Sequence, residues 1–369
     1  MPDAQIPDTQ IPDTRTPGAR KAGPSAAEAD FRGLPDVAGR ALGGAVLYAN
    51  DEFYADAHNL IAPQFAVHDP AAFGVRGKVY DGWETRRRRE PGEDFAIVRL
   101  AAPAVVRGVT IDTAHFKGNY PPFGSVEGAT LLGYPPVAEV LAAEWTALVD
   151  KTDLEGDWAN VVPVSGPDRI VTHVRLTIYP DGGVARLRVF GEVVPDPRLL
   201  GGRVDLAAVR SGGLVESCSN MFFASPANVL SPGHARVMSD GWETARRRDD
   251  GNDWLVVRLA APGVLHHAVI DTSRFVGNAP GHARLSDAES GKELLPRTRL
   301  LPDTEHRFRI RPAGQVRLVR LDIYPDGGIS RLRLVGVVPP ERHEPIARRW
   351  LDLLPPSLAA GADQSEFFD

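Results

Sequence analysis

The stretch DGWET at residues 81–85 decides the architecture, because it returns unchanged at residues 240–244, an offset of 159 (240 − 81). Three further strings recur: FAIVRLAAP at 95–103 as WLVVRLAAP at 254–262, IDT at 111–113 and 270–272, and IYPDGG at 178–183 and 323–328. The last pair has an offset of 145 (323 − 178), so the first copy carries 14 extra residues (159 − 145). Periods this long indicate two duplicated domains, since solenoid repeats span roughly 20 to 50 residues.

The duplication divides the chain into four segments. Residues 1–30 repeat a Pro-, Ala- and Asp-rich pattern that buries little, which predicts a disordered N-terminal tail. The first repeat is expected at 31–205, the second at 206–340, and a C-terminal extension at 341–369.

The hydrophobic pattern predicts an all-β chain. Apolar residues alternate at 174–178 and at 187–189, and the intervening Pro-Asp-Gly-Gly favours a turn, so these runs predict a β-hairpin. Phe95–Leu100 and Val105–Ile111 are expected as two strands separated by Ala-Ala-Pro. Helical periodicity appears only at 138–149 and 345–354. Each copy is therefore expected to form a jelly-roll-like antiparallel β-sandwich.

Composition restricts the function classes. The formal net charge of the 369 residues is −6, which disfavours a nucleic-acid-binding surface. The sequence has no apolar run near the roughly 20 residues needed to cross a bilayer. The single cysteine, Cys218, cannot form an intramolecular disulfide, so the cytoplasm is the expected location.

The first candidate cluster is the run from Asp81 to Arg89, which offers two carboxylates, a tryptophan ring and four consecutive arginines. Carboxylates accept N–H bonds, the ring could stack, and Arg86 could grip a carboxylate with its planar fork. Such a set suits a small, planar, anionic ligand. The alternative is a turn at Asp-Gly, a core Trp83 and a solvated arginine face.

The second cluster, Asp112 to Tyr120, follows a predicted strand. His115 can exchange protons near neutral pH, and Lys117 and Asn119 can stabilise developing charge. His115 could equally be a loop histidine satisfied by neighbouring backbone. The second copy has Arg274 in place of His115 and Val276 in place of Lys117, so the two copies have specialised here.

These strings resemble the allantoicase family, whose members carry two such repeats. The resemblance rests on FRGLPDVA from Phe31, VYDGWETRRRR from Val79, IDTAHFKGNYP from Ile111 and IYPDGGVARLR from Ile178, with SDGWETARRR and IDTSRFVGNAP in the second copy. It covers about residues 31–340. The resemblance implies two jelly-roll-like domains, a homo-oligomer and a hydrolase that splits allantoate into ureidoglycolate and urea during purine (allantoin) degradation. Arg274 and Val276 depart from the His and Lys that family second repeats often carry.

The chemistry that the resemblance implies assigns roles by residue type. His115, Glu84 and Lys117 are the expected catalytic residues, and Asp81, Trp83, Arg86, Asp112 and Asn119 are expected to bind substrate. No cofactor is predicted, and the spacing of the ten histidines leaves metal dependence open. Nucleic acid and membrane partners are not expected. The alternative is a tandem jelly-roll protein that binds a carbohydrate or another ligand without catalysis.

Overall fold

The computed structural model describes residues 31–75, 77–311 and 314–368, so the predicted disordered tail at 1–30 lies outside the described residues. Each repeat is an antiparallel β-sandwich built around one strand of 19 residues, β5 (Asp94–Asp112) in the first repeat and β15 (Asp253–Asp271) in the second. The two long strands occupy equivalent places in sequence, as the internal duplication predicts.

Strand β5 belongs to both sheets of its sandwich. Its first half pairs with β1 (Ala45–Ala49) and β9 (Val171–Tyr179), and its second half pairs with β8 (Ala159–Pro163) and β11 (Arg186–Val193). Sheet order continues from β9 to β6 (Phe123–Ala129) and β7 (Thr146–Asp153). The register on β9 shifts between Arg99 and Ala104, where the strand passes from one sheet to the other.

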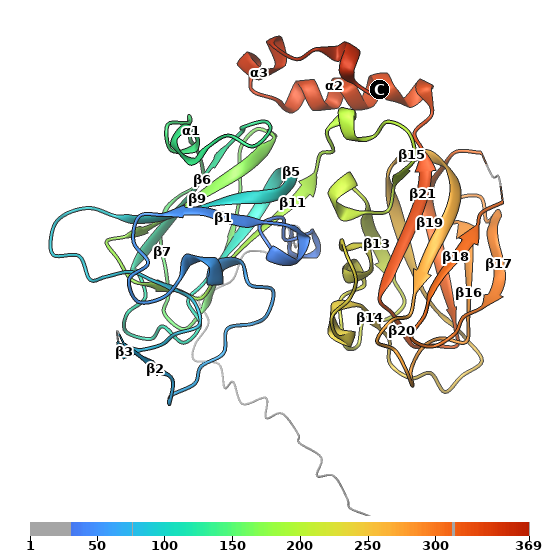
Figure 1. Ribbon diagram of the computed structural model, residues 1–369, viewed down its shortest axis with the longest axis horizontal. Helices are drawn as coiled ribbons and strands as arrows, with labels where there is room; N and C mark the ends of the chain where they lie inside the picture. The colour runs from blue at the N-terminus through green and yellow to red at the C-terminus, as the bar shows by residue number, and fades with distance from the viewer. Residues whose placement is uncertain (1–30, 76, 312–313, 369) are drawn as a thin grey trace, which may run out of the picture. The chain divides into compact units, whose positions relative to one another are not determined.

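The second repeat has the same arrangement (Figure 1). Its first sheet is formed by β13 (Leu214–Cys218), β15, β19 (Val316–Tyr324), β16 (His282–Asp287) and β17 (Glu293–Arg299). The other contains β12 (Val204–Asp205), β21 (Arg331–Val337), β15 and β18 (Glu305–Arg309). Two-residue strands complete the fold: β2 (Phe73–Gly74), β3 (Gly77–Lys78), β4 (Trp83–Glu84), β10 (Gly183–Val184), β14 (Trp242–Glu243) and β20 (Gly328–Ile329).

Helices are few and short. The α-helices are α1 (Val137–Leu141), α2 (His343–Leu353) and α3 (Pro356–Ala360). Single 3-10 turns lie at Phe31–Gly33, Arg40–Leu42, Ala57–Ile61, Pro197–Leu199, Val209–Ser211, Pro226–Leu230, Met238–Asp240, Pro340–Arg342 and Gln364–Glu366. Among the described residues, no helix is long and apolar enough to cross a membrane.

Each sandwich has its own apolar core. Alternate side chains of β5 and β9 point between the sheets, and Ile111, Leu176 and Ile178 are fully buried there. In the C-terminal extension, Trp350 of α2 packs with Val105 and Ile170 of the first repeat. Burial of this apolar surface is the main favourable term in folding.

Three local predictions need correction. The expected hairpin at 174–189 is wrong, because β9 and β11 each pair with β5 in opposite halves of the sandwich. The two expected strands at 95–111 are one continuous strand. Only the start of the predicted helix 138–149 is helical, since β7 begins at Thr146 and pairs with β6, and sheet pairing overrides the local propensity. The predicted helix at 345–354 is confirmed as α2.

Candidate active site

A small two-strand ladder carries the first candidate cluster. Strand β4 pairs with β10, so that Trp83 lies opposite Val184 and Glu84 opposite Gly183. Trp83 is fully buried, and its indole Nε1 donates to the carbonyl oxygen of Asp51 at 2.7 Å. The buried ring has no face open for stacking, which disfavours a role in substrate binding, and that role stays a prediction. Its position in the core of the first repeat fits the core alternative.

The second cluster is held against this ladder by Phe116. This ring is fully buried and lies against Gly183, where an added Cβ would come within 2.0 Å of the Phe116 Cε1 atom. Gly82 approaches the same ring, with an added Cβ at 2.8 Å from Cε2. Only glycine permits this close approach. The packing draws residues 113–120 over the β4–β10 ladder.

Glu84 and Asn119 meet as a result. Asn119 Nδ2 donates to Glu84 Oε1 at 2.7 Å, and the Asn119 carbonyl oxygen accepts a hydrogen bond from Gly183 N. Burial raises the pKa of Glu84, and the Asn119 hydrogen bond opposes that rise only in part. A raised pKa shifts Glu84 in the direction that a general acid requires.

His115 occupies a constrained backbone position. Its φ is 70°, and its backbone N donates to Asp157 Oδ1 at 2.8 Å. The imidazole Nε2 lies 3.1 Å from the carbonyl oxygen of Ala66, and its ring stacks with His68 at a centroid distance of 5.5 Å. Because the Ala66 carbonyl oxygen and the His68 ring hold the imidazole in one orientation, His115 can serve as a general base or acid.

A partly buried ion pair lies beside this histidine. Arg186 is 2% exposed and donates from Nη2 to Asp81 Oδ2 at 2.8 Å. Burial alone would raise the pKa of Asp81, but hydrogen bonds from Arg186 and from Val67 N, with the nearby charges of Arg186 and His115, lower it. Asp81 is therefore an ionised group that neutralises Arg186, and it shares the electrostatic environment of His115.

The remaining predicted residues lie in different settings. Asp112 is half-buried and accepts from Ala114 N at 2.9 Å. The Lys117 side chain is 79% exposed, with Nζ 3.8 Å from Asp157. Arg86 Nε donates to Asp51 Oδ2 at 2.7 Å, and its guanidinium lies over Phe53. The structure thus brings Glu84 to Asn119 and His115 towards Asp81, whereas Arg86 is already engaged by Asp51.

Sequence reasoning missed three residues of this region. Arg186 is the partner of Asp81, and Asp157 binds the His115 loop. His68 lies between the rings of Tyr80 and His115, and its Nδ1 is buried without a hydrogen-bond partner among the described residues. Of the three, only Arg186 could have been identified as a candidate from the sequence, since RLR follows PDGG after two intervening residues in both copies.

The second repeat keeps the framework and changes the chemistry. Trp242 is fully buried, and Asn278 Nδ2 donates to Glu243 Oε1 at 2.5 Å. Arg274 has a φ of 75° and donates from Nε to the carbonyl oxygen of Ala235. This contact is the counterpart of the one between His115 Nε2 and the carbonyl oxygen of Ala66. The framework residues are therefore shared by both copies, and the imidazole belongs to the first.

Two side-chain groups in the described part of the chain could hold a metal ion: Glu52 with Asp56 and His58, and His234 with Asp271 and Glu305. In both groups the candidate ligand atoms lie within 4.8 Å of one another. Neither contains a residue of the Glu84–His115 region. Metal dependence therefore gains no support from that region.

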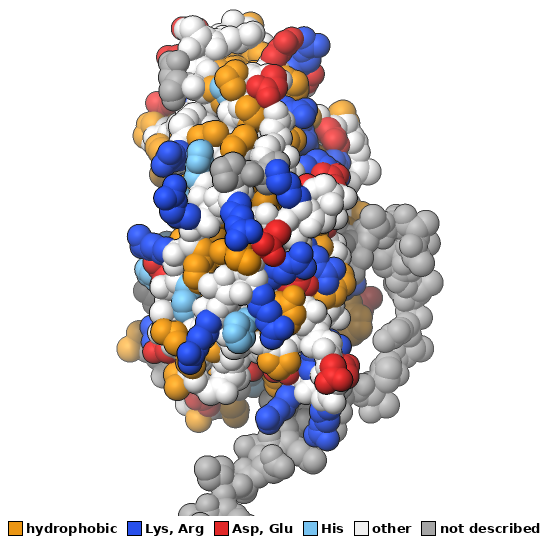
Figure 2. All heavy atoms as spheres, turned by 90° about the vertical axis from the view of Figure 1, so that its right-hand side faces the viewer, with side chains coloured by type: hydrophobic (Ala, Val, Ile, Leu, Met, Phe, Trp, Pro, Cys, Tyr) orange, Lys and Arg blue, Asp and Glu red, His pale blue; other side chains and the backbone are white. Residues whose placement is uncertain are grey.

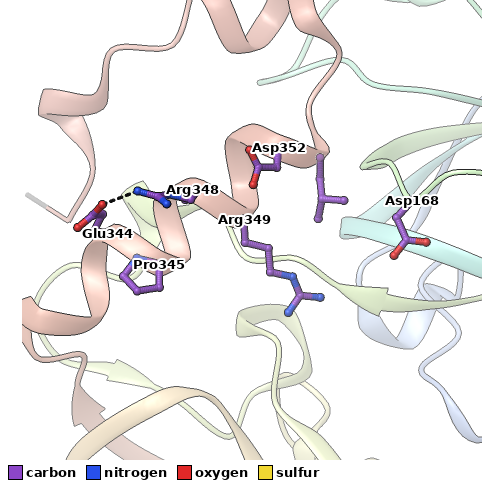
Figure 3. A pocket seen from close by; sticks show the side chains of 7 residues that line it. Asp168, Glu344, Pro345, Arg348, Arg349 and Asp352 are labelled. Carbon is purple, nitrogen blue, oxygen red and sulfur yellow. Dashed lines mark hydrogen bonds and ion pairs between the residues drawn. The ribbon is translucent and has the colours of Figure 1, made fainter.

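A cavity of about 480 Å³ lies elsewhere, beside α2 (Figure 3). Four of its five charged lining residues form ion pairs, Arg348 with Glu344, Asp168 with Arg107 and Arg349 with Glu192, and Asp352 is the fifth. On the face of the molecule in Figure 2, basic and histidine side chains are interspersed with apolar and acidic ones. The predicted absence of a nucleic-acid partner remains a prediction.

Comparisons with known proteins give a consistent result. The sequence model described as "Allantoicase repeat" matches residues 35–194 and again residues 204–339. A protein named "Probable allantoicase" from Nocardia farcinica is 54% identical over 322 residues, covering 85% of this chain and 98% of that protein. One of the same name from Streptomyces coelicolor is 48% identical over 345 residues, covering 89% and 92%.

Solved structures agree. The crystal structure of allantoicase from Saccharomyces cerevisiae superimposes with a TM-score of 0.74 at 34% identity, covering 85% of this chain and 98% of that one. A second structure, titled "Structure of allantoicase", gives a TM-score of 0.76, also at 34% identity, and covers 86% of this chain and 100% of that one.

Proposed function

This chain belongs to the allantoicase family, and on that premise we propose that it hydrolyses allantoate to ureidoglycolate and urea at a site on its first repeat. Allantoate has a central carbon that bears a carboxylate and two ureido groups. Release of urea breaks one C–N bond at that carbon and forms a C–O bond with water. The site must therefore deliver a proton to the leaving nitrogen and remove one from water.

Glu84 is our candidate for the acid. The single observation that carries this assignment is its position: a partly buried carboxyl group with a raised pKa, oriented by Asn119 at 2.7 Å. A protonated Glu84 would give its proton to the departing urea nitrogen while the remaining ureido nitrogen supports the electron-poor carbon. General acid catalysis of this kind contributes about 10² to 10⁴ in rate.

His115 is our candidate for the base. A neutral imidazole can take a proton from the attacking water, and the ring is held by the Ala66 carbonyl oxygen and by stacking on His68. Asp112 and Asn119 are proposed to bind the ureido groups, and the exposed Lys117 to attract the substrate carboxylate. Arg86 would join as a carboxylate contact through Nη1 and Nη2, which have no hydrogen-bond partner among residues 31–75, 77–311 and 314–368.

Family membership also supports two further proposals, on oligomeric state and on location. We propose that the chain forms a homo-oligomer, which light scattering on the purified protein would test. We also retain the cytoplasm as the proposed location.

The decisive experiment is incubation of the purified chain with allantoate, with separate measurement of urea and ureidoglycolate. Equal amounts of the two products are expected. Binding of allantoate without release of urea would instead support the alternative of a ligand-binding protein. Related ureido acids that lack the second ureido group serve as substrate controls.

A further inference from the structure

The buried arginines of the two repeats differ in their counter-ions. Arg186 and Arg331 occupy equivalent places, since each follows PDGG and lies opposite the last residue of its long strand, Asp112 or Asp271. Arg186 is neutralised by Asp81. Arg331 is 6% exposed and, within the described chain, donates only to backbone carbonyl oxygens, those of Gly233 at 3.0 Å and of Asp240 and Ser330 at 2.6 Å each.

One nitrogen of Arg331 is left over. Its Nη2, the counterpart of the nitrogen that Arg186 gives to Asp81, has no hydrogen-bond partner within the described residues and is not sealed from solvent. A guanidinium removed from water without a carboxylate is costly. Arg331 therefore lacks the direct ion pair that Arg186 makes, although the charges of Asp240 and Asp271 act on it, and its Nη2 remains an open donor.

The missing ion pair has a specific cause. Asp240, the equivalent of Asp81, is taken by Arg236, whose backbone N and side-chain Nε both donate to Asp240 Oδ2 at 2.9 and 3.1 Å. In the first repeat the equivalent residue is Val67, which donates only its backbone N to Asp81. The side chain of Arg236 thus competes with Arg331 for the carboxylate and leaves Arg331 available.

A second cation lies on the neighbouring loop. Arg274 replaces His115, and only its Nε is engaged, by the carbonyl oxygen of Ala235 at 3.2 Å, within the part of the chain that is described. A guanidinium stays charged and cannot shuttle a proton near neutral pH, so this loop can attract an anion but cannot repeat the proposed role of His115.

We propose that the second repeat holds a non-catalytic binding site for a small carboxylate, anchored by Arg331 and assisted by Arg274. Planar guanidinium groups match carboxylates with paired, charge-assisted hydrogen bonds. The second repeat also keeps the Glu243–Asn278 pair, so we assign the ligand to small ureido carboxylates, an assignment that rests on the proposed function of the first repeat. A divalent metal on His234, Asp271 and Glu305 is the rival occupant, and the charges of Arg331 and Arg333 beside Asp271 oppose it.

The test is isothermal titration calorimetry of the full chain with N-carbamoylglycine, which has a carboxylate and one ureido group but no second ureido group to release. We expect about two bound molecules per chain in the original protein and about one in Arg331→Gln, with urea release from allantoate unchanged. If the proposed function of the first repeat is wrong but this site exists, we expect about one bound molecule per chain in the original protein and none in Arg331→Gln.

A second variant covers the case in which Arg331→Gln fails to fold. Arg236→Val replaces a side chain that is 64% exposed with valine, the residue at the equivalent position of the first repeat. The change frees the Asp240 carboxylate to pair with Arg331, so the affinity of the second site should fall at least about tenfold. Arg317→Gln, at an exposed arginine that pairs with Glu289, is the matched control and should bind as the original does.

Three results would overturn the proposal. The first is unchanged stoichiometry and affinity in both Arg331→Gln and Arg236→Val. The second is loss of urea release in folded Arg331→Gln. The third is binding of Mn²⁺ alone that is abolished by His234→Ala and that competes with N-carbamoylglycine.

Discussion

Asn119 donates a hydrogen bond from Nδ2 to Glu84 Oε1 at 2.7 Å, although the two residues lie 35 positions apart in the chain. Asn278 and Glu243 repeat this bond at 2.5 Å, also across 35 positions. The duplicated fold therefore orients a carboxyl group twice. The residues around it differ, and the predictions below use that difference.

Glu84→Gln should lower kcat about 10²-fold or more, because glutamine keeps a hydrogen-bond acceptor for Asn119 but cannot donate an acidic proton. Burial raises the pKa of Glu84, so the protonated form survives to higher pH than for an exposed glutamate, and kcat/KM should decline as pH rises through that pKa. Steady-state rates across pH check this. Glu243→Gln is the control, and an equal loss in both variants would argue against a single site on the first repeat.

His115→Ala should cost far more turnover than Arg274→Ala, by about two orders of magnitude, although the two residues occupy equivalent loops. Only the imidazole can exchange a proton near neutral pH. Kinetics should be measured together with thermal melts. A His115→Ala protein that melts early yet turns over normally would reduce His115 to a packing role, and equal losses would favour a site built from both repeats.

Trp83→Phe should destabilise the protein by about 1–3 kcal/mol, because it removes buried volume and the hydrogen bond to the Asp51 carbonyl oxygen. KM for allantoate should stay the same, since the ring has no exposed face. Guanidinium unfolding and steady-state kinetics give the two values. A large rise in KM with unchanged stability would restore Trp83 as a substrate contact.

His173→Leu should make the protein less sensitive to acid. Burial, with a smaller effect from the charge of Arg99, lowers the pKa of His173 to about 4, well below the roughly 6.5 of an unfolded histidine. The unfolded chain therefore binds this proton first, so the stability contribution is complete above about pH 6.5 and is lost as pH falls towards 4, at up to about 1.4 kcal/mol per pH unit.

Leucine is the matched choice for that substitution, because Leu318 is the equivalent residue of the second repeat. Unfolding free energies at several pH values between 7 and 4 would measure the change in slope, which is expected to be shallower in His173→Leu. Parallel pH dependence in the two proteins would show that His173 binds protons equally in the folded and unfolded states.

The sequence alone determined the duplication, the β-sandwich class and the family, because each depends on local patterns repeated along the chain. DGWET and PDGG mark the same turns twice, and period-two alternation requires strands with one buried face. It could not determine strand pairing. The pattern at 174–189 predicts a hairpin, yet β9 and β11 each pair with β5 and not with each other. Burial of both strands against distant parts of the chain stabilises this pairing more than a local hairpin would.

The tertiary structure alone decided how the candidate site is arranged. Residue type suggested Glu84, Asn119, His115 and Asp81, but their contacts depend on Phe116 packing against Gly183, a residue 67 positions away. Trp83 looked like a stacking platform until burial placed it in the core. The sequence likewise did not show the different partners of Arg186 and Arg331, because both lie in the same RLR string. The aspartate beside Arg186 pairs with that arginine, whereas the aspartate beside Arg331 pairs with Arg236. Such competition is settled by distances in three dimensions, and a one-dimensional pattern does not contain them.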